Sequence, residues 1–386
     1  MVSRVLAAFW NLLRQLFMRG ALLRWWVGRR SRQWERAYCA ELVRSSRLPV
    51  APITASILCR PVGQLGQILL IADCMWEQND LVPELSRIAE TRLLDLRPLL
   101  KAASAHQPPA ATVTEAMRNF AAGDPKLSPD VILFYARPGL LSEEVFQILR
   151  KRWKCPLLGM NLDDKQMFFP YGIFQRGDDN YQHWARKFDL NLTNCLPATE
   201  WYRERGLPCL YSPQGVHRPA GLTEPLSADF KYEFSFLGSI KPERELIIGQ
   251  LQRAGVEINL FGAGWPDTRW VDDPNAVFRS TQINLGIGFA SPSLNLTTIK
   301  GRDFECVGVG ACYLTTYNWE LPLHYELGKE ILCYRSVEEL IEIYSYYRRR
   351  PEECLRIAQA AWRRCSAEHT WEKRFRRVFR EAGFNT

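Results

Sequence analysis

The strongest constraint on the fold is an alternation of short apolar runs with amphipathic segments, which begins at residue 67 and continues almost to the C-terminus. The apolar runs are rich in Leu, Ile, Val and Phe, and the segments between them have helical spacing. Continuous apolar strands joined by helices are typical of parallel sheets covered on both faces. The expected strands are 67–73, 92–96, 131–136, 156–161, 190–194, 207–213, 232–238, 257–262, 283–288, 311–316 and 330–334. The expected helices include 81–89, 142–153, 199–206, 242–254, 298–307, 336–349, 351–365 and 371–382.

The alternation is interrupted once, by a loop rich in Pro, Gly and Ser over residues 213–229. A chain of 386 residues is long enough for two domains. We therefore predict two α/β domains with parallel, Rossmann-like sheets, over residues 56–218 and 219–369. The last helix, within 370–386, is long enough to return to the first domain. If the two domains face each other, the carboxyl ends of both sheets border a central cleft, where open α/β sheets bind ligands.

Composition excludes several classes of protein. With 47% hydrophobic and 24% charged residues, the chain is neither disordered, collagenous nor a small disulfide scaffold. Its 11 Cys are scattered singly, without a C-x-x-C pair. This pattern favours reduced thiols in a cytoplasmic protein and gives no sign of a metal site.

The net charge of +8 is concentrated at the N-terminus. Residues 1–50 carry ten Arg against only Glu35 and Glu41, whereas the remainder balances 40 basic with 40 acidic side chains. A nucleic-acid surface would need a basic face on a folded domain, so we expect no nucleic-acid partner. The charge instead marks residues 1–55 as a separate basic, Trp-rich helical extension.

Residues 2–27 have the pattern of an amphipathic helix, with Arg4, Arg14 and Arg19 in one sector and apolar side chains around the rest. The apolar stretches are too short to span a bilayer. One interpretation is an interfacial helix on an anionic membrane surface, which would place the protein at the inner face of the cytoplasmic membrane. The alternative is a helix that packs on its own domain.

The sharpest local pattern is SLNLTTIKGRDFECVGVGACYLTT over 293–316. Arg302 and Glu305 are three residues apart near the start of an expected helix, and Lys300 adds a further cation. A helix N-terminus and two cations suit phosphate, while a Glu can accept two hydrogen bonds from a ribose diol. The alternative for Arg302 and Glu305 is a surface salt bridge.

A second pattern is FLGSIKPERE over 236–245, a strand followed by a glycine turn and a helix. Gly238 and Ser239 would let the backbone approach a ligand, and Arg244 could reach a diphosphate. The pattern is neither a P-loop nor G-x-G-x-x-G.

Residues 213–376 resemble the CgeB-like branch of the group 1 glycosyltransferases, and residues 188–219 are similar to the end of that family's N-terminal domain. The landmarks that carry the resemblance are YEFSFLGSI, R-E-L at 244–246, LFGAGW, INLG, KGRDFE, LTTYN, GKEILCY and EHTWEKRF.

The resemblance implies a GT-B glycosyltransferase that binds a nucleotide-diphosphate sugar in its C-terminal domain and needs no metal or other cofactor. Glu305 would hold the nucleotide ribose. Lys300, Arg302 and Arg244 would stabilise the departing diphosphate, as a divalent metal does in other transferases. The loops with Gly238 and Ser239 and with Gly262 and Gly264 would leave room for the donor.

The chain departs from the family pattern at Thr297, where retaining relatives carry a first glutamate. This departure leaves three hypotheses. The leading one is a sugar transferase that acts on a cell-envelope, lipid-linked or protein acceptor. The second is a sugar-nucleotide epimerase, and the third is a catalytically silent GT-B module that recruits partners.

The acceptor side is predicted from residues that follow expected strands. Asp73 follows the first strand, with Trp76 and Glu77 beyond it, and Asp163 and Asp164 follow the fourth. Carboxylates there could deprotonate an acceptor hydroxyl, and an aromatic ring could stack on a sugar. The alternative is helix capping or loop solvation. Asp163 and Asp164 are not expected to bind metal, because no second ligand cluster accompanies them.

His217 lies in the interdomain linker and is a third candidate base, with Asp73 and Asp163. The alternative for a linker His is simple exposure to solvent.

Overall fold

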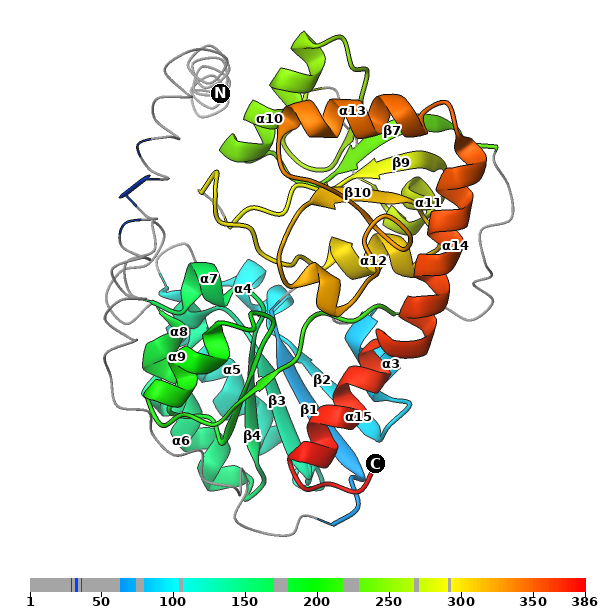
Figure 1. Cartoon of the computed structure of the whole chain (residues 1–386). Helices are drawn as coiled ribbons and strands as arrows, with labels where there is room; N and C mark the ends of the chain where they lie inside the picture. The colour runs from blue at the N-terminus through cyan, green and yellow to red at the C-terminus, as the bar shows by residue number, and fades with distance from the viewer. Residues whose placement is uncertain are drawn as a thin grey trace. The chain divides into compact units, whose positions relative to one another are not determined.

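The computed structural model describes residues 29, 32, 33, 36, 63–73, 80–103, 107–169, 180–217, 229–266, 271–290 and 293–386. They divide into two compact units. Among the described residues, one unit combines 63–217 with 364–386, and the other contains 229–363. Each unit contains one parallel sheet with helices against it (Figure 1), so the prediction of a two-sheet α/β protein is confirmed.

The sheet of the first unit has six strands in the order β2-β1-β3-β4-β5-β6, and every neighbouring pair is parallel. The strands are β1 (Gln67–Ala72), β2 (Glu90–Asp95), β3 (Val131–Tyr135), β4 (Leu157–Asn161), β5 (Leu190–Thr193) and β6 (Cys209–Tyr211). All six lie where the sequence predicts them. Residues of β4 and β5 are buried throughout, which explains why these runs are apolar without alternation.

The helices of the first unit include several that the sequence analysis did not predict. The unpredicted helices are α4 (Arg97–Ala102), α5 (Pro109–Gly123), α7 (Asp164–Met167) and α8 (Tyr181–Ala185). The predicted helices are α6 (Glu143–Arg152) and α9 (Ala198–Glu204), whereas the expected helix 81–89 is only α3 (Val82–Leu85).

Helix α6 shows why a predicted helix forms where it does. Its N-cap Ser142 accepts a hydrogen bond from Val145 N–H, Glu143 lies in the first turn and Arg152 in the last. These charges complement the helix dipole at both ends. Capping and charge therefore mark both ends of this helix in the sequence.

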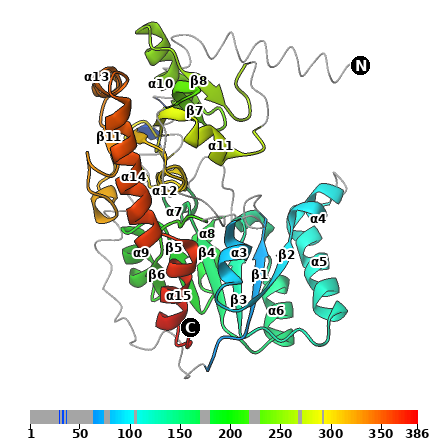
Figure 2. The same ribbon diagram turned by 90° about the vertical axis from the view of Figure 1, so that its right-hand side faces the viewer.

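The C-terminal helix α15 (Trp371–Glu381) packs into the core of the first unit. The rings of Trp371, Phe375 and Phe379 stack along one helix face, with centroids 5.6 and 5.9 Å apart. Thr370 caps the helix and pairs with Val216 in an isolated bridge. Figure 2 shows α15 at the end of the chain, following α14 (Pro351–Glu368).

The second unit has a five-stranded parallel sheet in the order β11-β10-β9-β7-β8. Its strands are β7 (Tyr232–Leu237), β8 (Asn259–Phe261), β9 (Thr281–Leu285), β10 (Tyr313–Thr316) and β11 (Leu332–Tyr334). Its helices are α10 (Pro242–Arg253), α11 (Pro274–Arg279), α12 (Arg302–Gly308) and α13 (Val337–Tyr347), and α14 crosses the boundary between the units.

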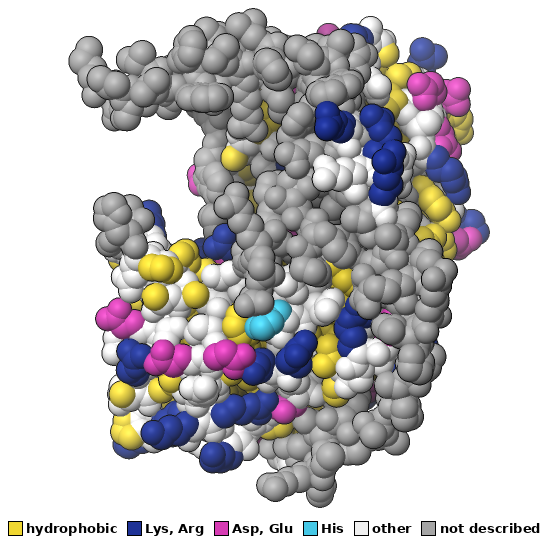
Figure 3. Space-filling view, turned by 90° about the vertical axis from the view of Figure 1, so that its left-hand side faces the viewer, with side chains coloured by type: hydrophobic (Ala, Val, Ile, Leu, Met, Phe, Trp, Pro, Cys, Tyr) yellow, Lys and Arg dark blue, Asp and Glu magenta, His cyan; other side chains and the backbone are white. Residues whose placement is uncertain are grey.

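Two properties of the described residues concern membrane spanning and surface charge. No helix among them is long and apolar enough to cross a membrane. On the face drawn in Figure 3, Lys and Arg side chains are interspersed with Asp and Glu side chains, in keeping with the balanced charge of residues 51–386. The predicted N-terminal helix, residues 2–27, lies outside the described residues.

Candidate functional site

The strand order of the second unit indicates where a ligand would bind. From β7 the chain passes to β8 on one side and then to β9 and β10 on the other, so the order reverses between β7 and β9. Ligands of open α/β sheets bind at the carboxyl ends of the strands beside such a reversal. The segments that follow β7, β8 and β9 at this edge contain the predicted donor residues.

The loop after β7 brings Gly238, Ser239 and Arg244 together, as the sequence predicts. Arg244, in the first turn of α10, donates from Nη1 to the Ser239 carbonyl at 2.9 Å. Its guanidinium also lies 5.7 Å from the ring centroid of Phe236. A cation is therefore held beside the backbone at the end of β7.

The loop after β8 packs against the loop after β7. Gly262 and Gly264 have positive φ values of 107° and 92°. A Cβ at Gly262 would lie 2.8 Å from the carbonyl of Gly238, and Trp265 Nε1 donates to that same carbonyl at 2.7 Å. Gly262 and Gly264 thus shape the two loops, which accounts for their glycines without any ligand.

Helix α12 begins at Arg302 rather than at residue 298, so that Lys300 lies in the loop before the helix and not on it. The expected start was wrong because Thr298 N–H bonds to the Gly288 carbonyl at 2.8 Å, which ties this segment to the end of β9. The loop after β9 also forms an antiparallel bridge between Phe289 and Thr297, the position where the family pattern has a glutamate.

The sequence analysis missed Asp303, which holds this loop in place. Its carboxylate accepts hydrogen bonds from Lys300 N–H at 2.7 Å and from the Thr315 hydroxyl of β10 at 3.0 Å. Burial raises the pKa of Asp303 to about 6, although these two hydrogen bonds lower it. The only signal in the sequence was its place in KGRDFE, because a buried carboxylate cannot be told from an exposed one by residue type.

Arg302 and Glu305 do not form the salt bridge that was the alternative to a ligand site. Within the described ranges, neither side chain has an ion-pair partner. The buried Nε of Arg302 also has no hydrogen-bond partner there. The carboxylate of Glu305 folds back over Gly301, at the beginning of α12. Lys300, Arg302 and Glu305 are thus gathered at one helix start.

Replacing Gly301 with Ala tests the position of this carboxylate without removing it. The new Cβ would lie 2.7 Å from Glu305 Oε1, while Gly301 itself has helical φ and ψ of −50° and −39°. We expect Gly301→Ala to keep or raise stability by up to about 1 kcal/mol, and to weaken nucleotide binding by about 1 kcal/mol or more through displacement of Glu305.

The measurements for Gly301→Ala are urea unfolding and calorimetric titration with nucleotide. Gly249→Ala in α10 is the matched control, because a Cβ there meets no atom within 4 Å. Equal nucleotide affinities for the two variants would contradict the prediction.

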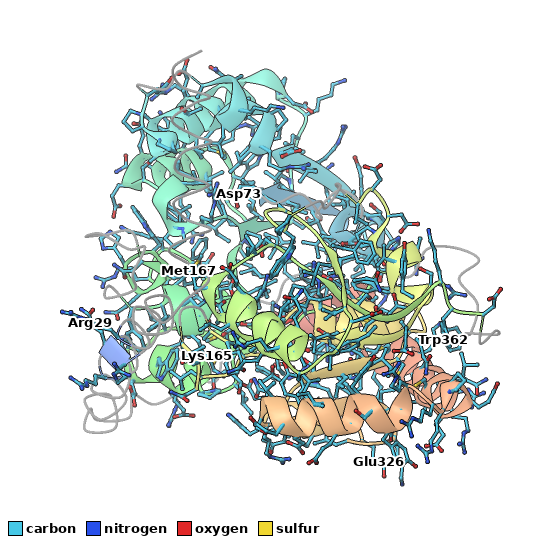
Figure 4. The ribbon with its side chains drawn as sticks, turned by 90° about the horizontal axis from the view of Figure 1, so that it is seen from above. Arg29, Asp73, Lys165, Met167, Glu326 and Trp362 are labelled. Atoms are coloured by element: carbon cyan, nitrogen blue, oxygen red, sulfur yellow. The ribbon has the colours of Figure 1, made fainter. Side chains whose placement is uncertain are left out.

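In the first unit, Asp73 is not an open carboxylate. Its Oδ2 lies 2.6 Å from Arg137 Nε, and the Asp73 side chain is only 1% exposed. Arg137 follows β3, which neighbours β1 in the sheet, and was not singled out in the sequence (Asp73 is labelled in Figure 4). The structure therefore places an ion pair where the sequence predicts a base.

Asp163 and Asp164 stand at the start of α7 and have different surroundings. Asp163 is half-buried at the N-cap position, without a side-chain capping bond. Asp164 has no exposed surface and accepts hydrogen bonds from Asn161 Nδ2 and from the Tyr202 hydroxyl. We correct the expectation of an acceptor contact at Asp164, because a fully buried carboxyl cannot meet a substrate.

The stability of the first unit should depend on pH through Asp164. Burial raises the pKa of its carboxyl from 3.8 to about 7. The folded state therefore binds a proton that the unfolded state has lost, so this group's contribution to stability falls as pH rises from about 4 to about 7. We expect Asp164→Asn to flatten that part of the profile, making the variant gain stability relative to the parent between pH 5 and pH 8 in urea unfolding. A constant difference across this range would contradict the prediction.

His217 is paired with a residue that the sequence analysis did not single out. Its Nδ1 lies 2.9 Å from Oε1 of Glu84 in α3, whose side chain is fully buried. Glu84 Oε2 also accepts the N–H of Glu372 at the start of α15 at 3.1 Å. Because the carboxylate accepts from Nδ1, the other ring nitrogen, Nε2, is the proton acceptor of the neutral ring. His217 is thus oriented rather than simply exposed.

Trp76 and Glu77, the other predicted acceptor residues, lie outside the described residues. Across the described part of the chain, no group of three or more His, Cys, Asp or Glu side chains could hold a metal ion.

Comparison with known families gives one match. Residues 244–380 match the Glycosyl transferase-like family. The matched segment begins at Arg244 and includes Lys300, Arg302 and Glu305. No curated protein matches the chain.

Several solved structures are similar to this chain. The sucrose-phosphate synthase from Thermosynechococcus elongatus aligns with a TM-score of 0.57 and 14% identity, covering 82% of this chain and 98% of that one. An α-glucosyltransferase in complex with UDP and DNA aligns at 0.54 and 10% identity, covering 82% and 98%. HepE from Anabaena, in complex with UDP and glucose, aligns at 0.52 and 10% identity, again covering 82% and 98%.

The structural similarities confirm the predicted GT-B fold. The family match confirms the predicted enzyme class, a glycosyltransferase. The narrower resemblance to the CgeB-like branch and the identity of the substrates are questions for the proposal that follows.

Proposed function

We propose that this protein is a metal-independent glycosyltransferase of the CgeB-like branch. It transfers a sugar from a nucleotide-diphosphate donor to a hydroxyl of a cell-envelope, lipid-linked or protein acceptor. UDP is the first candidate nucleotide, because two of the similar structures are described as complexes with UDP.

The observation that carries this proposal is the set of side chains at the start of α12. Arg302 and Glu305 are not neutralised by each other or by any other ion-pair partner in the described ranges. Asp303, buried beneath them, holds the Lys300 backbone through its N–H. A site prepared in this way offers two cations to a diphosphate and one carboxylate to a ribose.

The cations would meet the main chemical requirement of the donor half-reaction, which is stabilisation of the leaving group. When the bond between the anomeric carbon and the diphosphate oxygen breaks, negative charge develops on the leaving nucleoside diphosphate. Lys300, Arg302 and Arg244 would stabilise that charge from fixed positions. Glu305 would hold the ribose through charge-assisted hydrogen bonds, which orient the donor without taking part in bond breaking.

His217 is the best supported of the three candidate bases. Asp73 is engaged by Arg137, and the side chain of Asp163 makes no capping hydrogen bond at the start of α7. His217 instead has a buried carboxylate at Nδ1, which is the arrangement that orients a histidine base. In the proposed step, Nε2 accepts the proton of the acceptor hydroxyl as its oxygen bonds to the anomeric carbon. Glu84 is then a positioning residue.

A nucleotide titration tests the proposed function. Melting temperature is measured with UDP, GDP, TDP and CMP and with their common sugar conjugates, in the presence of EDTA. We expect one nucleotide to raise the melting temperature in a dose-dependent way, and Lys300→Ala with Arg302→Ala to abolish the rise.

Lys329→Ala is the control for this titration, since that lysine is exposed and paired with Glu326. If no nucleotide stabilises the protein, the transferase proposal fails and a catalytically silent module takes its place. If a nucleotide stabilises it only without EDTA, the claim of metal independence fails.

A further inference from the structure

We propose that Arg137 forms a binding site for an oxyanion in the first unit, so that the acceptor carries a phosphate or carboxylate group. This inference rests on the proposed function, which it deepens by naming a class of acceptor. Arg137 was not among the residues that the sequence singled out.

The position of Arg137 in the sheet is the first argument. In the order β2-β1-β3-β4-β5-β6, the chain passes from β1 to β2 on one side and then to β3 on the other, so the order reverses between β1 and β3. Asp73 follows β1 directly, and Arg137 comes two residues after the end of β3. The pair therefore stands at the point where an open α/β sheet binds its ligand.

The exposure of the two partners is the second argument. The side chain of Asp73 is 1% exposed, whereas that of Arg137 is 62% exposed. A molecule that reaches this edge of the sheet therefore meets the guanidinium and not the carboxylate. Asp73 restricts the orientation of Arg137, which lowers the entropy lost when a ligand binds.

The unused donors of Arg137 are the third argument. The bond to Asp73 uses Nε, and the described residues offer no hydrogen-bond acceptor to Nη1 or Nη2. These two nitrogens form a planar fork that matches two oxygens of a phosphate or a carboxylate.

A neighbouring arginine shows how a structural pair differs from this arrangement. Arg97, just after β2, donates from both Nε and Nη2 to the two oxygens of Asp95 and is 28% exposed. Arg97 thus directs two of its nitrogens, Nε and Nη2, to a carboxylate of the protein. Arg137 directs only Nε to Asp73, so that Nη1 and Nη2 face the solvent.

The test is protection of Arg137 from modification by phenylglyoxal, followed by mass spectrometry of the peptide that contains it. The full-length protein is treated with glucose 6-phosphate, glucuronate or glucose as the probe. We expect the phosphate or the carboxylate probe to slow modification of Arg137 about five-fold or more at saturation, and glucose to have no effect. The two anionic probes distinguish a phosphate acceptor from a carboxylate acceptor.

Arg118 provides the control within the same protein. It is 58% exposed and paired with Glu144, and it lies within helix α5 rather than in a segment that directly follows a strand. Its modification should be unaffected by every probe. Equal protection of Arg118 and Arg137, or no protection of Arg137, would overturn the proposal.

Variants give a second measurement by calorimetric titration with the probe that protects Arg137. We expect Arg137→Lys, which keeps the charge and loses the fork, to bind that probe at least about ten-fold more weakly, and Arg118→Ala to bind it as the parent does. Unchanged affinity of Arg137→Lys would contradict a bidentate site. Lysine is chosen because alanine would leave the buried Asp73 without this cation and risks unfolding the protein.

The outcome for Arg137 is separable from that of the proposed function. UDP-dependent stabilisation should be the same for Arg137→Lys and the parent, because the donor residues lie in the other unit. Protection of Arg137 without any nucleotide binding would leave the anion site standing and remove the transferase. Nucleotide binding without protection of Arg137 would leave the transferase proposal standing and remove the anion site.

Discussion

His217→Asn is expected to lower the rate of sugar transfer by about 10²–10⁴-fold, the usual contribution of a general base. Asparagine keeps an N–H donor near the position of Nδ1, so the bond to Glu84 and the local structure should survive. The ring nitrogen Nε2, which accepts the proton in the proposed step, is lost. Nucleotide affinity should not change, because the donor residues lie in the other unit.

The rate can be measured before the acceptor is known, as release of nucleotide from the sugar nucleotide that stabilises the protein, with water as the acceptor. His183→Asn, in α8 of the same unit, is the control. Glu84→Gln should cause a smaller loss, because the base remains and only its orientation is weakened. A full rate in His217→Asn would show that the His217–Glu84 contact serves structure and would return the role of base to Asp163.

Glu305→Gln is expected to weaken nucleotide binding by about 1–3 kcal/mol, the value of hydrogen bonds that involve a charged group. This loss corresponds to an increase in Kd of about 5- to 150-fold. Glutamine keeps the size of the side chain and its place over Gly301, so a change in affinity reports the lost charge. No ion pair in the described ranges is broken by this substitution, and stability should therefore stay within about 0.5 kcal/mol of the parent.

Calorimetric titration with nucleotide and with nucleoside measures the effect of Glu305→Gln. A carboxylate that holds the ribose should affect both ligands equally, whereas one that acts on the diphosphate should affect only the nucleotide. Glu326→Gln, at an exposed pair with Lys329, is the matched control. Equal Kd values for Glu305→Gln and the control would remove Glu305 from the site.

The order of the elements was predictable because strands buried on both faces need long apolar runs. All eleven strands lie within a few residues of the runs that predict them. Helix ends were less predictable. Helix α6 begins where its cap and charges place it, but α12 begins at Arg302 because the preceding residues are bonded to the end of β9. That constraint comes from a residue ten positions away and leaves no local signal.

The sequence singled out the proposed donor residues Lys300, Arg302 and Glu305 as a group, since they lie close together along the chain. What the sequence could not decide was whether Arg302 and Glu305 neutralise each other. Both outcomes are compatible with a spacing of three residues on a helix. Only the folded loop, in which the Glu305 carboxylate lies over Gly301, distinguishes these two outcomes.

The sequence by itself determined the two α/β sheets, because these follow from hydrophobic periodicity, while the class of enzyme was implied by the family resemblance of residues 213–376. The tertiary structure alone decided the surroundings of the residues that were predicted on the acceptor side. Asp73 meets Arg137 across 64 positions, and Glu84 meets His217 across 133. Asp164, in the first turn of α7, is fully buried. Burial and side-chain contacts over such separations arise only when strands pair. No local sequence pattern therefore shows whether a carboxylate is a base, an ion-pair partner or part of the core.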